Sequence, residues 1–218
     1  MVIFDCNGVL VDSEPLATSV VSREFMRAGF ALTPDIVARY FTGRRPTDMF
    51  AEVEIAAGRK LPGDFAATVT AAILRRFRAE LRATPHVDRA LSWLRGPKCV
   101  ASASPLDRIR VALETTDLIR YFEPYLYSGN DVRNSKPAPD LFLHVARKMH
   151  VDPGTCIVVE DSPVGVAAGV AAGMMVIGFA GGSHAGSHLD ENLRLAGAHS
   201  VITDMRGLPG AVIDLRGW

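Results

Sequence analysis

The sequence predicts an α/β fold in which a Rossmann-like, doubly wound parallel sheet is interrupted early by an all-helical insertion. From residue 85 onward, short apolar runs alternate with segments of helical periodicity, which is typical of parallel strands buried on both faces. In region 15–84, apolar residues recur every three to four positions and no strand is predicted. We therefore expect a core domain of residues 1–14 and 85–218 and a helical domain of residues 15–84.

The individual elements are expected in the following order. The first strand covers residues 2–4, and helical spacing predicts helices over 15–29, from Pro34 after a capping Thr33, over 47–58 and over 64–82. After a helix over 86–95, the predicted strands are 98–102, 125–127, 156–159, 175–179 and 200–202. The helices between these strands are expected over 105–116, capped by Ser104, over 136–149 and over 162–173.

The first strand ends in a carboxylate. Residues 1–14 read MVIFDCNGVLVDSE, so an apolar run leads to Asp5 and then to a turn containing Cys6, Asn7 and Gly8. Ligands of open parallel sheets bind outside the carboxyl ends of the strands, so Asp5 is expected to face a site. A solvated aspartate at a strand end is the alternative, and the repetition of the pattern in later segments favours the site.

Three further groups are expected at the same sheet edge. Ser102 ends one predicted strand, Glu160 and Asp161 end another, and Lys136 lies in a loop. Paired carboxylates suit a hard cation such as Mg²⁺, whereas a lysine, a hydroxyl and the backbone N–H groups of the turn after Asp5 suit phosphate oxygens. Together these groups predict a phosphoryl-transfer site.

Composition excludes several classes of function. Lys plus Arg and Asp plus Glu number 24 each, so there is no broad basic field for nucleic acid or an acidic membrane, and any anion site must be local. Three cysteines without metal-ligand spacing indicate buried thiols in a reducing compartment. Since no apolar run approaches the ~20 residues of a membrane span and no signal-peptide pattern is present, a cytoplasmic protein is expected.

Four motifs occur in order along the chain: DCNGVLVDSE, VASAS, the lysine of KPAPD, and VVEDSPVGVAAGVAAGM. They resemble those of the haloacid dehalogenase-like superfamily of hydrolases, in the branch similar to β-phosphoglucomutase and small sugar-phosphate phosphatases. The resemblance covers essentially the whole chain. It implies that the helical insertion is a cap over a Rossmann-like core.

The resemblance also implies roles for individual residues. Asp5 would be the nucleophile that forms an aspartyl-phosphate, while Ser102 and Lys136 would hold the phosphoryl oxygens. Lys136 would also keep the nucleophile ionised. Cys6, Gly8 and Ala103 would contribute backbone groups that bind the same phosphoryl oxygens.

A magnesium site is implied beside the nucleophile. Its ligands would be Asp5, the backbone carbonyl of Asn7, Asp161, and Glu160 either directly or through water. Asp161 is also a good residue with which to begin a helix before Ser-Pro, and its position beside Glu160 favours the metal role over the cap.

Asn7 departs from the family pattern. Phosphatases of this group carry an aspartate two residues after the nucleophile, where it protonates the leaving oxygen and then activates water. An amide cannot exchange a proton near neutral pH, so substrate binding should survive while turnover falls. The sequence leaves open whether Asn7 is natural or introduced.

Two basic pairs lie outside these motifs. Arg44 and Arg45 lie in a loop between predicted helices and would either grip an anionic group of the substrate or form a solvated pair. His184 and His188 lie among glycines and serines, so a mobile surface stretch is favoured over a zinc site. For the second motif, Ser102 is favoured as the phosphate-binding hydroxyl and Ser104 as the helix cap.

The sequence thus predicts a monomeric, Mg²⁺-dependent phosphatase that acts on a small phosphorylated metabolite such as a sugar or polyol phosphate. The helical cap favours a small enclosed substrate over a phosphoprotein. A phosphosugar mutase and a non-catalytic protein that binds phosphorylated metabolites remain as alternatives. No nucleic-acid or membrane partner is expected.

Overall fold

A single parallel sheet forms the centre of the protein in a computed structural model that describes residues 1–217, apart from the side chain of Phe41. Within those residues the sheet has six strands in the order β3-β2-β1-β4-β5-β6, and every pairing is parallel. The strands are β1 (Val2–Phe4), β2 (Lys98–Ser102), β3 (Leu126–Ser128), β4 (Ile157–Glu160), β5 (Met175–Phe179) and β6 (Ser200–Ile202). The predicted parallel α/β fold is therefore confirmed.

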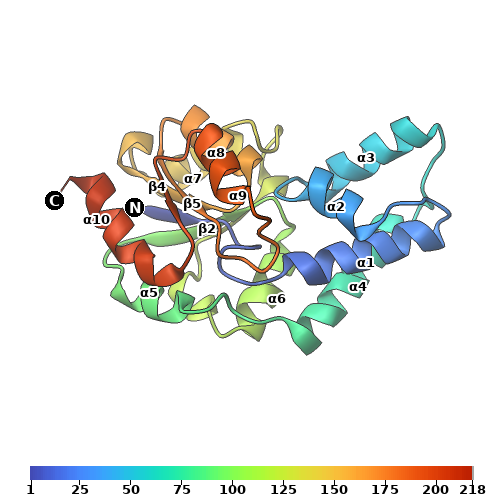
Figure 1. Ribbon diagram of the computed structural model, residues 1–218, viewed down its shortest axis with the longest axis horizontal. Helices are drawn as coiled ribbons and strands as arrows, with labels where there is room; N and C mark the ends of the chain where they lie inside the picture. The colour runs from blue at the N-terminus through green and yellow to red at the C-terminus, as the bar shows by residue number, and fades with distance from the viewer. Residues whose placement is uncertain (218) are drawn as a thin grey trace.

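Helices cover both faces of the sheet (Figure 1). The first four, which lie to one side of the sheet, are α1 (Glu14–Arg27), α2 (Pro34–Phe41), α3 (Pro46–Ala57) and α4 (Phe65–Glu80). The others are α5 (Val87–Trp93), α6 (Leu106–Thr115), α7 (Asp140–Lys148), α8 (Pro163–Ala171), α9 (Leu189–Leu195) and α10 (Leu208–Arg216). None of the helices within residues 1–217 is both long enough and apolar enough to cross a lipid bilayer.

Alternation along β1 explains why the sheet needs helices on both sides. Val2 and Phe4 point into one hydrophobic cluster, which also contains apolar residues of α5, α6 and α10. Ile3 points the other way, into a second cluster with α7, α8 and α9. Each of the three residues is at most 2% exposed, so the strand is buried on both faces as its continuous apolar sequence predicts.

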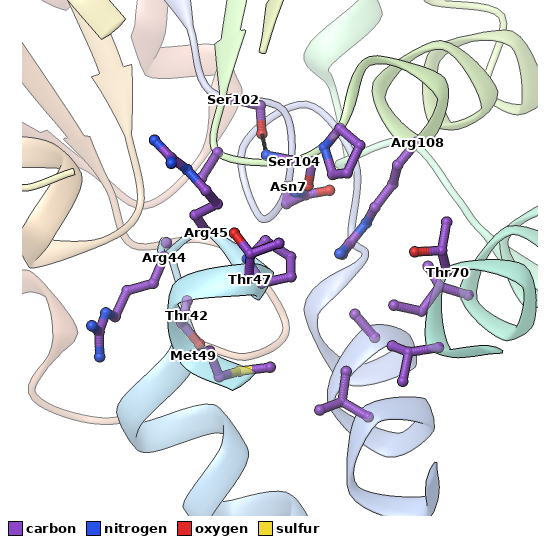
Figure 2. A pocket seen from close by; sticks show the side chains of 18 of the residues that line it. Asn7, Thr42, Arg44, Arg45, Thr47, Met49, Thr70, Ser102, Ser104 and Arg108 are labelled. Atoms are coloured by element: carbon purple, nitrogen blue, oxygen red, sulfur yellow. Dashed lines mark hydrogen bonds between the residues drawn. The ribbon is translucent and has the colours of Figure 1, made fainter. Parts of the chain in front are cut away.

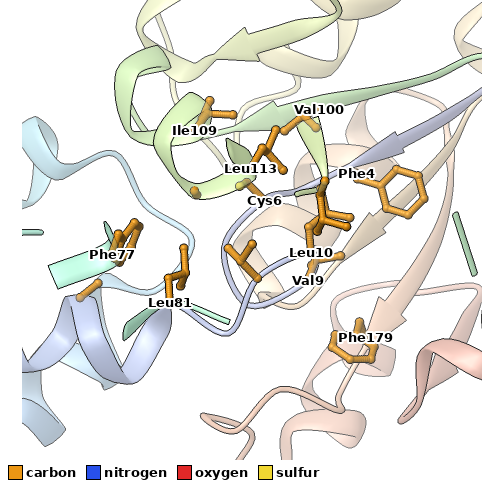
Figure 3. Close-up of a cluster of buried hydrophobic side chains, with 14 of the residues drawn as sticks. Phe4, Cys6, Val9, Leu10, Phe77, Leu81, Val100, Ile109, Leu113 and Phe179 are labelled. Atoms are coloured by element: carbon orange, nitrogen blue, oxygen red, sulfur yellow. The ribbon is translucent and has the colours of Figure 1, made fainter. Parts of the chain in front are cut away.

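The helices α1–α4 share a core with the sheet. Phe25 packs against three aromatic rings of the same segment, with the ring centroid of Phe65 at 4.8 Å. This aromatic group belongs to the same cluster as Phe4, and Figure 3 shows Phe77 beside Leu81 in the part of that cluster that lies away from the sheet. The two ends of the segment are held together, because the N–H of Asp12 donates to Arg82 and that of Thr84 donates to Leu10, both at 3.0 Å.

Several element boundaries differ from the expected ones. The third strand is shifted by one residue to Leu126–Ser128, and α7 begins at Asp140 rather than at Lys136. Ser104 was wrongly expected to cap α6: Pro105 is the N-cap residue and no side chain caps this helix. Thr33 does cap α2, where its hydroxyl accepts a hydrogen bond from the N–H of Ile36 at 3.4 Å.

Candidate active site

Asp5, Lys136 and Glu160 form the centre of the candidate site. Asp5 directly follows β1, and its N–H continues the sheet by donating to the carbonyl of Val159 on β4 at 3.0 Å. The ammonium of Lys136 lies 2.6 Å from Oδ1 of Asp5 and also donates to Oε1 of Glu160. Lys136 is 2% exposed and Glu160 is 1% exposed, so this ion-pair network is removed from water. Residues separated by more than 130 positions are thus brought together at one sheet edge.

Glu160 is held in place by the start of α8. Its second oxygen, Oε2, accepts hydrogen bonds from the N–H groups of Asp161 and Ser162, both at 3.1 Å, and from the Ser162 hydroxyl at 2.9 Å. The carboxylate lies so close to Gly165 that a Cβ atom there would overlap it. The small residues of this motif therefore permit the helix to approach the carboxylate.

Asp161 faces the turn that follows the nucleophile candidate. Its Oδ2 atom lies where a Cβ of Gly8 would be, and Gly8 has a positive φ of 73° that favours glycine. Nε2 of His184 lies 2.9 Å from this oxygen, at ion-pair distance, although neither atom forms a hydrogen bond of regular geometry. Ser162, not Asp161, caps α8.

Excess negative charge makes this site suitable for a cation. Lys136 pairs with the buried carboxylates of Asp5 and Glu160, and a third buried carboxylate, that of Asp161, is close enough to raise the pKa of Asp5. Burial raises the pKa of Asp5 to about 7, although Lys136 opposes the rise and the two other carboxylates add to it. Burial likewise raises the pKa of Asp161 to about 6. A bound cation would relieve both effects, since it favours the ionised carboxylates.

The oxygen atoms available at this site suit Mg²⁺ better than they suit a metal that is coordinated by side chains alone. Within residues 1–217 no three His, Cys, Asp or Glu side chains converge into a metal site. Magnesium commonly takes one or two carboxylates and completes its shell with water and substrate phosphate. The unpartnered Oδ2 of Asp161, the carboxylate of Asp5 and the backbone carbonyl of Asn7 match that requirement.

Asn7 is engaged by two serines. Its Nδ2 donates to Oγ of Ser104 at 2.8 Å, and its Oδ1 accepts from the hydroxyl of Ser13 at 3.1 Å. Its backbone N–H donates to Oδ2 of Asp5 at 3.0 Å. The side chain therefore lies beside the nucleophile candidate, although an amide there cannot transfer a proton.

The phosphate-binding candidates have different surroundings. The hydroxyl of Ser102 accepts a 3.4 Å hydrogen bond from the N–H of Ser104, and Ala103 lies between them on the cavity wall. The N–H of Gly8, however, donates to the carbonyl of Val11 at 2.8 Å, so it is not free for an anion in this conformation. Cys6 is fully buried, and burial raises the pKa of its thiol, so its side chain is not a nucleophile.

A cavity opens between the core and helices α1–α4 (Figure 2). The core contributes Asp5, Asn7 and Ser102 to its lining, and the loop before α3 contributes Arg44 and Arg45. Lys136, Glu160 and Asp161 are not among the lining residues in the described part of the chain. The nucleophile candidate is thus reached from the cavity, while the charges that surround it lie outside the lining.

Both loop arginines already have partners. Arg44 forms a bidentate salt bridge with Glu52 of α3, and Arg45 donates hydrogen bonds to the carbonyls of Val132 and Arg133 in the core. The sequence predicted either a solvated pair or two arginines free to bind an anionic group of the substrate. The arrangement in the structure matches neither prediction fully. Arg45 ties the α2–α3 loop to the core at the mouth of the cavity.

Two residues near the site were not identified from the sequence. Arg108 of α6 lines the cavity, and its side chain is buried. His184 was expected in a mobile surface stretch, but it packs against Asp161, whereas His188 is exposed. A usable signal existed for His184, because its loop follows β5 at the same sheet edge as Asp5.

Comparison with known proteins agrees with this geometry. The family model of the haloacid dehalogenase-like hydrolases matches residues 1–173. A 6-phosphogluconate phosphatase of Escherichia coli K12 is 34% identical over 184 residues, which cover 84% of this chain and 83% of the relative. A phosphorylated carbohydrates phosphatase of Thermotoga maritima is 30% identical, with 79% of this chain and 81% of the relative covered.

A solved structure gives the same picture. The crystal structure of a haloacid dehalogenase-like protein of unknown function from Agrobacterium tumefaciens C58 superposes with a TM-score of 0.82 at 36% identity, covering 99% of this chain and 98% of that one. Fold, motif order and sequence similarity agree over most of the length. The chain is therefore an enzyme that belongs to the haloacid dehalogenase-like hydrolase family.

Proposed function

We propose that this protein is a Mg²⁺-dependent phosphatase that hydrolyses a small phosphorylated sugar or polyol through an aspartyl-phosphate. The observation that carries the proposal is the contact of Asp5 with Lys136 at 2.6 Å, at a cavity between the core and the helical segment. The relatives named as phosphatases of 6-phosphogluconate and of phosphorylated carbohydrates support this substrate class.

The chemistry would proceed in two steps. An oxygen of Asp5 attacks phosphorus, the P–O bond to the sugar breaks, and the leaving oxygen takes a proton from water, because the amide of Asn7 cannot supply one. Water then attacks the aspartyl-phosphate, releasing inorganic phosphate and restoring Asp5. Splitting one displacement into two lowers the barrier for each.

Each neighbouring group would have a defined task. Lys136 keeps Asp5 ionised and, with the hydroxyl of Ser102, binds phosphoryl oxygens. Asp5, Asp161 and the carbonyl of Asn7 would hold Mg²⁺, with Glu160 as a further ligand either directly or through water. The ion would supply charge neutralisation for the phosphoryl group. Residues 15–84 would act as a cap that excludes water from the cavity.

Asn7 sets the expected rate. It occupies the place of the acid–base residue, and since its amide cannot protonate the leaving oxygen, turnover should be slow while binding is retained.

The three buried free cysteines support a reducing, cytoplasmic location.

The proposal is tested by steady-state phosphate release. The purified protein is incubated with Mg²⁺ and a panel of sugar, polyol and sugar-acid phosphates, with Asp5→Asn as the matched variant. We expect the parent protein to release phosphate and the Asp5→Asn variant to release none. Equal release from both proteins would reject Asp5 as the nucleophile.

A further inference from the structure

Arg108 is a buried cation with no anionic partner. Its side chain extends from α6 into the cavity (Figure 2), and the residue is 8% exposed. None of the salt bridges within residues 1–217 involves Arg108, and its Nε atom is buried without a hydrogen-bond partner. The guanidinium carbon lies 5.2 Å from the ring centroid of Phe77, which provides a cation–π contact but no neutralising charge.

Such an arrangement is costly for the free protein. Arginine is almost never fully buried unless it is paired, because an unpaired charge loses its hydration. Burial lowers the pKa of Arg108, and the nearby charges of Glu14 and Asp5 oppose this effect without forming a salt bridge with it. The cost is understandable if the guanidinium is paired in the substrate complex.

The other two arginines that line the cavity cannot take this place without giving up existing bonds. Arg44 is paired with Glu52. The terminal nitrogens of Arg45 are bonded to the carbonyls of Val132 and Arg133, and only its Nε atom is left without a partner. Among the described residues that line the cavity, Arg108 is therefore the arginine whose guanidinium forms neither a hydrogen bond nor a salt bridge.

We infer that Arg108 binds a carboxylate at the end of the substrate remote from the phosphate, so that the enzyme selects phosphorylated sugar acids over neutral sugar phosphates. A guanidinium matches a carboxylate in both charge and planar shape. A second phosphate carries about two negative charges, and the neighbouring carboxylate of Glu14, which also lines the cavity, disfavours it. The inference rests on the proposed phosphatase function and specifies its substrate class.

The test uses two substrates that differ only at the remote end. 6-Phosphogluconate carries a carboxylate at C1, and glucitol 6-phosphate carries a hydroxymethyl group there. Values of kcat/KM are measured for the parent protein, for Arg108→Met and for Arg75→Met, a control at an exposed position of α4. Binding of 6-phosphogluconate with Mg²⁺ is measured in parallel by calorimetry.

The parent protein should prefer 6-phosphogluconate. Arg108→Met should lose about 30-fold or more in kcat/KM on that substrate, mainly through KM, because a buried charge partner is removed. It should lose less than about threefold on glucitol 6-phosphate, and Arg75→Met should match the parent on both. An equal loss on both substrates, or no preference in the parent, would overturn the inference.

Failure of the phosphatase proposal remains distinguishable. If the parent hydrolyses neither substrate, weaker calorimetric binding of 6-phosphogluconate by Arg108→Met still supports the inference, and unchanged binding refutes it. Thermal melting separates this role from a structural one: removal of an unpaired buried charge should leave the melting temperature of the free protein unchanged or raised. If Arg108→Met melts well below the parent, Arg108 has a structural role and the inference fails. In that case Arg108→Lys should not restore the preference for 6-phosphogluconate.

Discussion

Replacing Asn7 by aspartate should turn a slow phosphatase into a fast one. The change is nearly isosteric, and the surroundings can accept it. The hydroxyl of Ser13 already donates to Oδ1 of Asn7 at 3.1 Å, and the hydroxyl of Ser104, which now accepts from Nδ2 at 2.8 Å, can rotate to donate to a carboxylate. The variant should therefore keep the loop conformation while gaining a group that transfers protons.

The size of the gain follows from the missing chemistry. A positioned acid–base group typically contributes about 10²–10⁴-fold in rate, equivalent to about 2.7–5.4 kcal/mol of activation free energy. The new carboxyl would lie beside Asp5, whose pKa is already raised to about 7 by burial and by neighbouring carboxylates. That environment should also raise the pKa of an aspartate at position 7 and so help it to act as an acid.

The assay is phosphate release with Mg²⁺ from the best substrate of the panel. Asn7→Asp is compared with the parent and with Asn7→Ala, which removes the amide without supplying a proton donor. We expect a rise in kcat of at least about 100-fold for aspartate only. Equal rates for parent and Asn7→Asp would refute the missing-shuttle argument. No release from either, with metabolites still bound, would favour a non-catalytic binding protein.

The remaining predictions concern the charged centre and the thiols. Asp161→Ala should weaken Mg²⁺ binding by more than about tenfold in calorimetry, and an unchanged affinity would put the metal elsewhere. Lys136→Met should lower the free energy of unfolding in urea by about 3–5 kcal/mol, because it leaves two buried carboxylates unpaired; the exposed Lys148→Met should change little, and equal effects would contradict this reasoning. Burial raises the pKa of Cys99 to about 12, so the folded protein at pH 8 should not react with a thiol reagent until urea is added.

The fold could be predicted because its signals are local and repeated. Each strand is a short apolar run that must be buried on both faces, and this requirement alone implies a parallel sheet between helices. The gathering of Asp5, Lys136 and Glu160 followed from topology, since the carboxyl ends of parallel strands share one edge. The resemblance to the hydrolase family then supplied roles that the geometry alone could not.

The environment of individual side chains was harder to predict. Arg108, Ile109, Ala112 and Leu113 form the buried stripe of α6, so an arginine at the first position of that stripe was a signal that the sequence offered. Such a residue usually reaches solvent with its charged end. In the structure Arg108 is buried instead, and its guanidinium lies against the ring of Phe77. Ser104 failed as a cap for a similar reason, because a partner distant in sequence engages its hydroxyl.

Asp5 and Arg108 both line the cavity but have opposite charge requirements, and this difference limits what can bind. Around Asp5, buried carboxylates outnumber lysine, so a phosphate can approach only if a cation balances them. On α6, Arg108 lacks an anion. A molecule with a phosphate at one end and a carboxylate at the other, bound together with Mg²⁺, satisfies both requirements. A neutral sugar phosphate satisfies only the first, and a free sugar acid only the second. Binding energy at Arg108 would then be gained by substrates whose phosphate is already positioned for attack, which is how remote contacts raise specificity in an enclosed site.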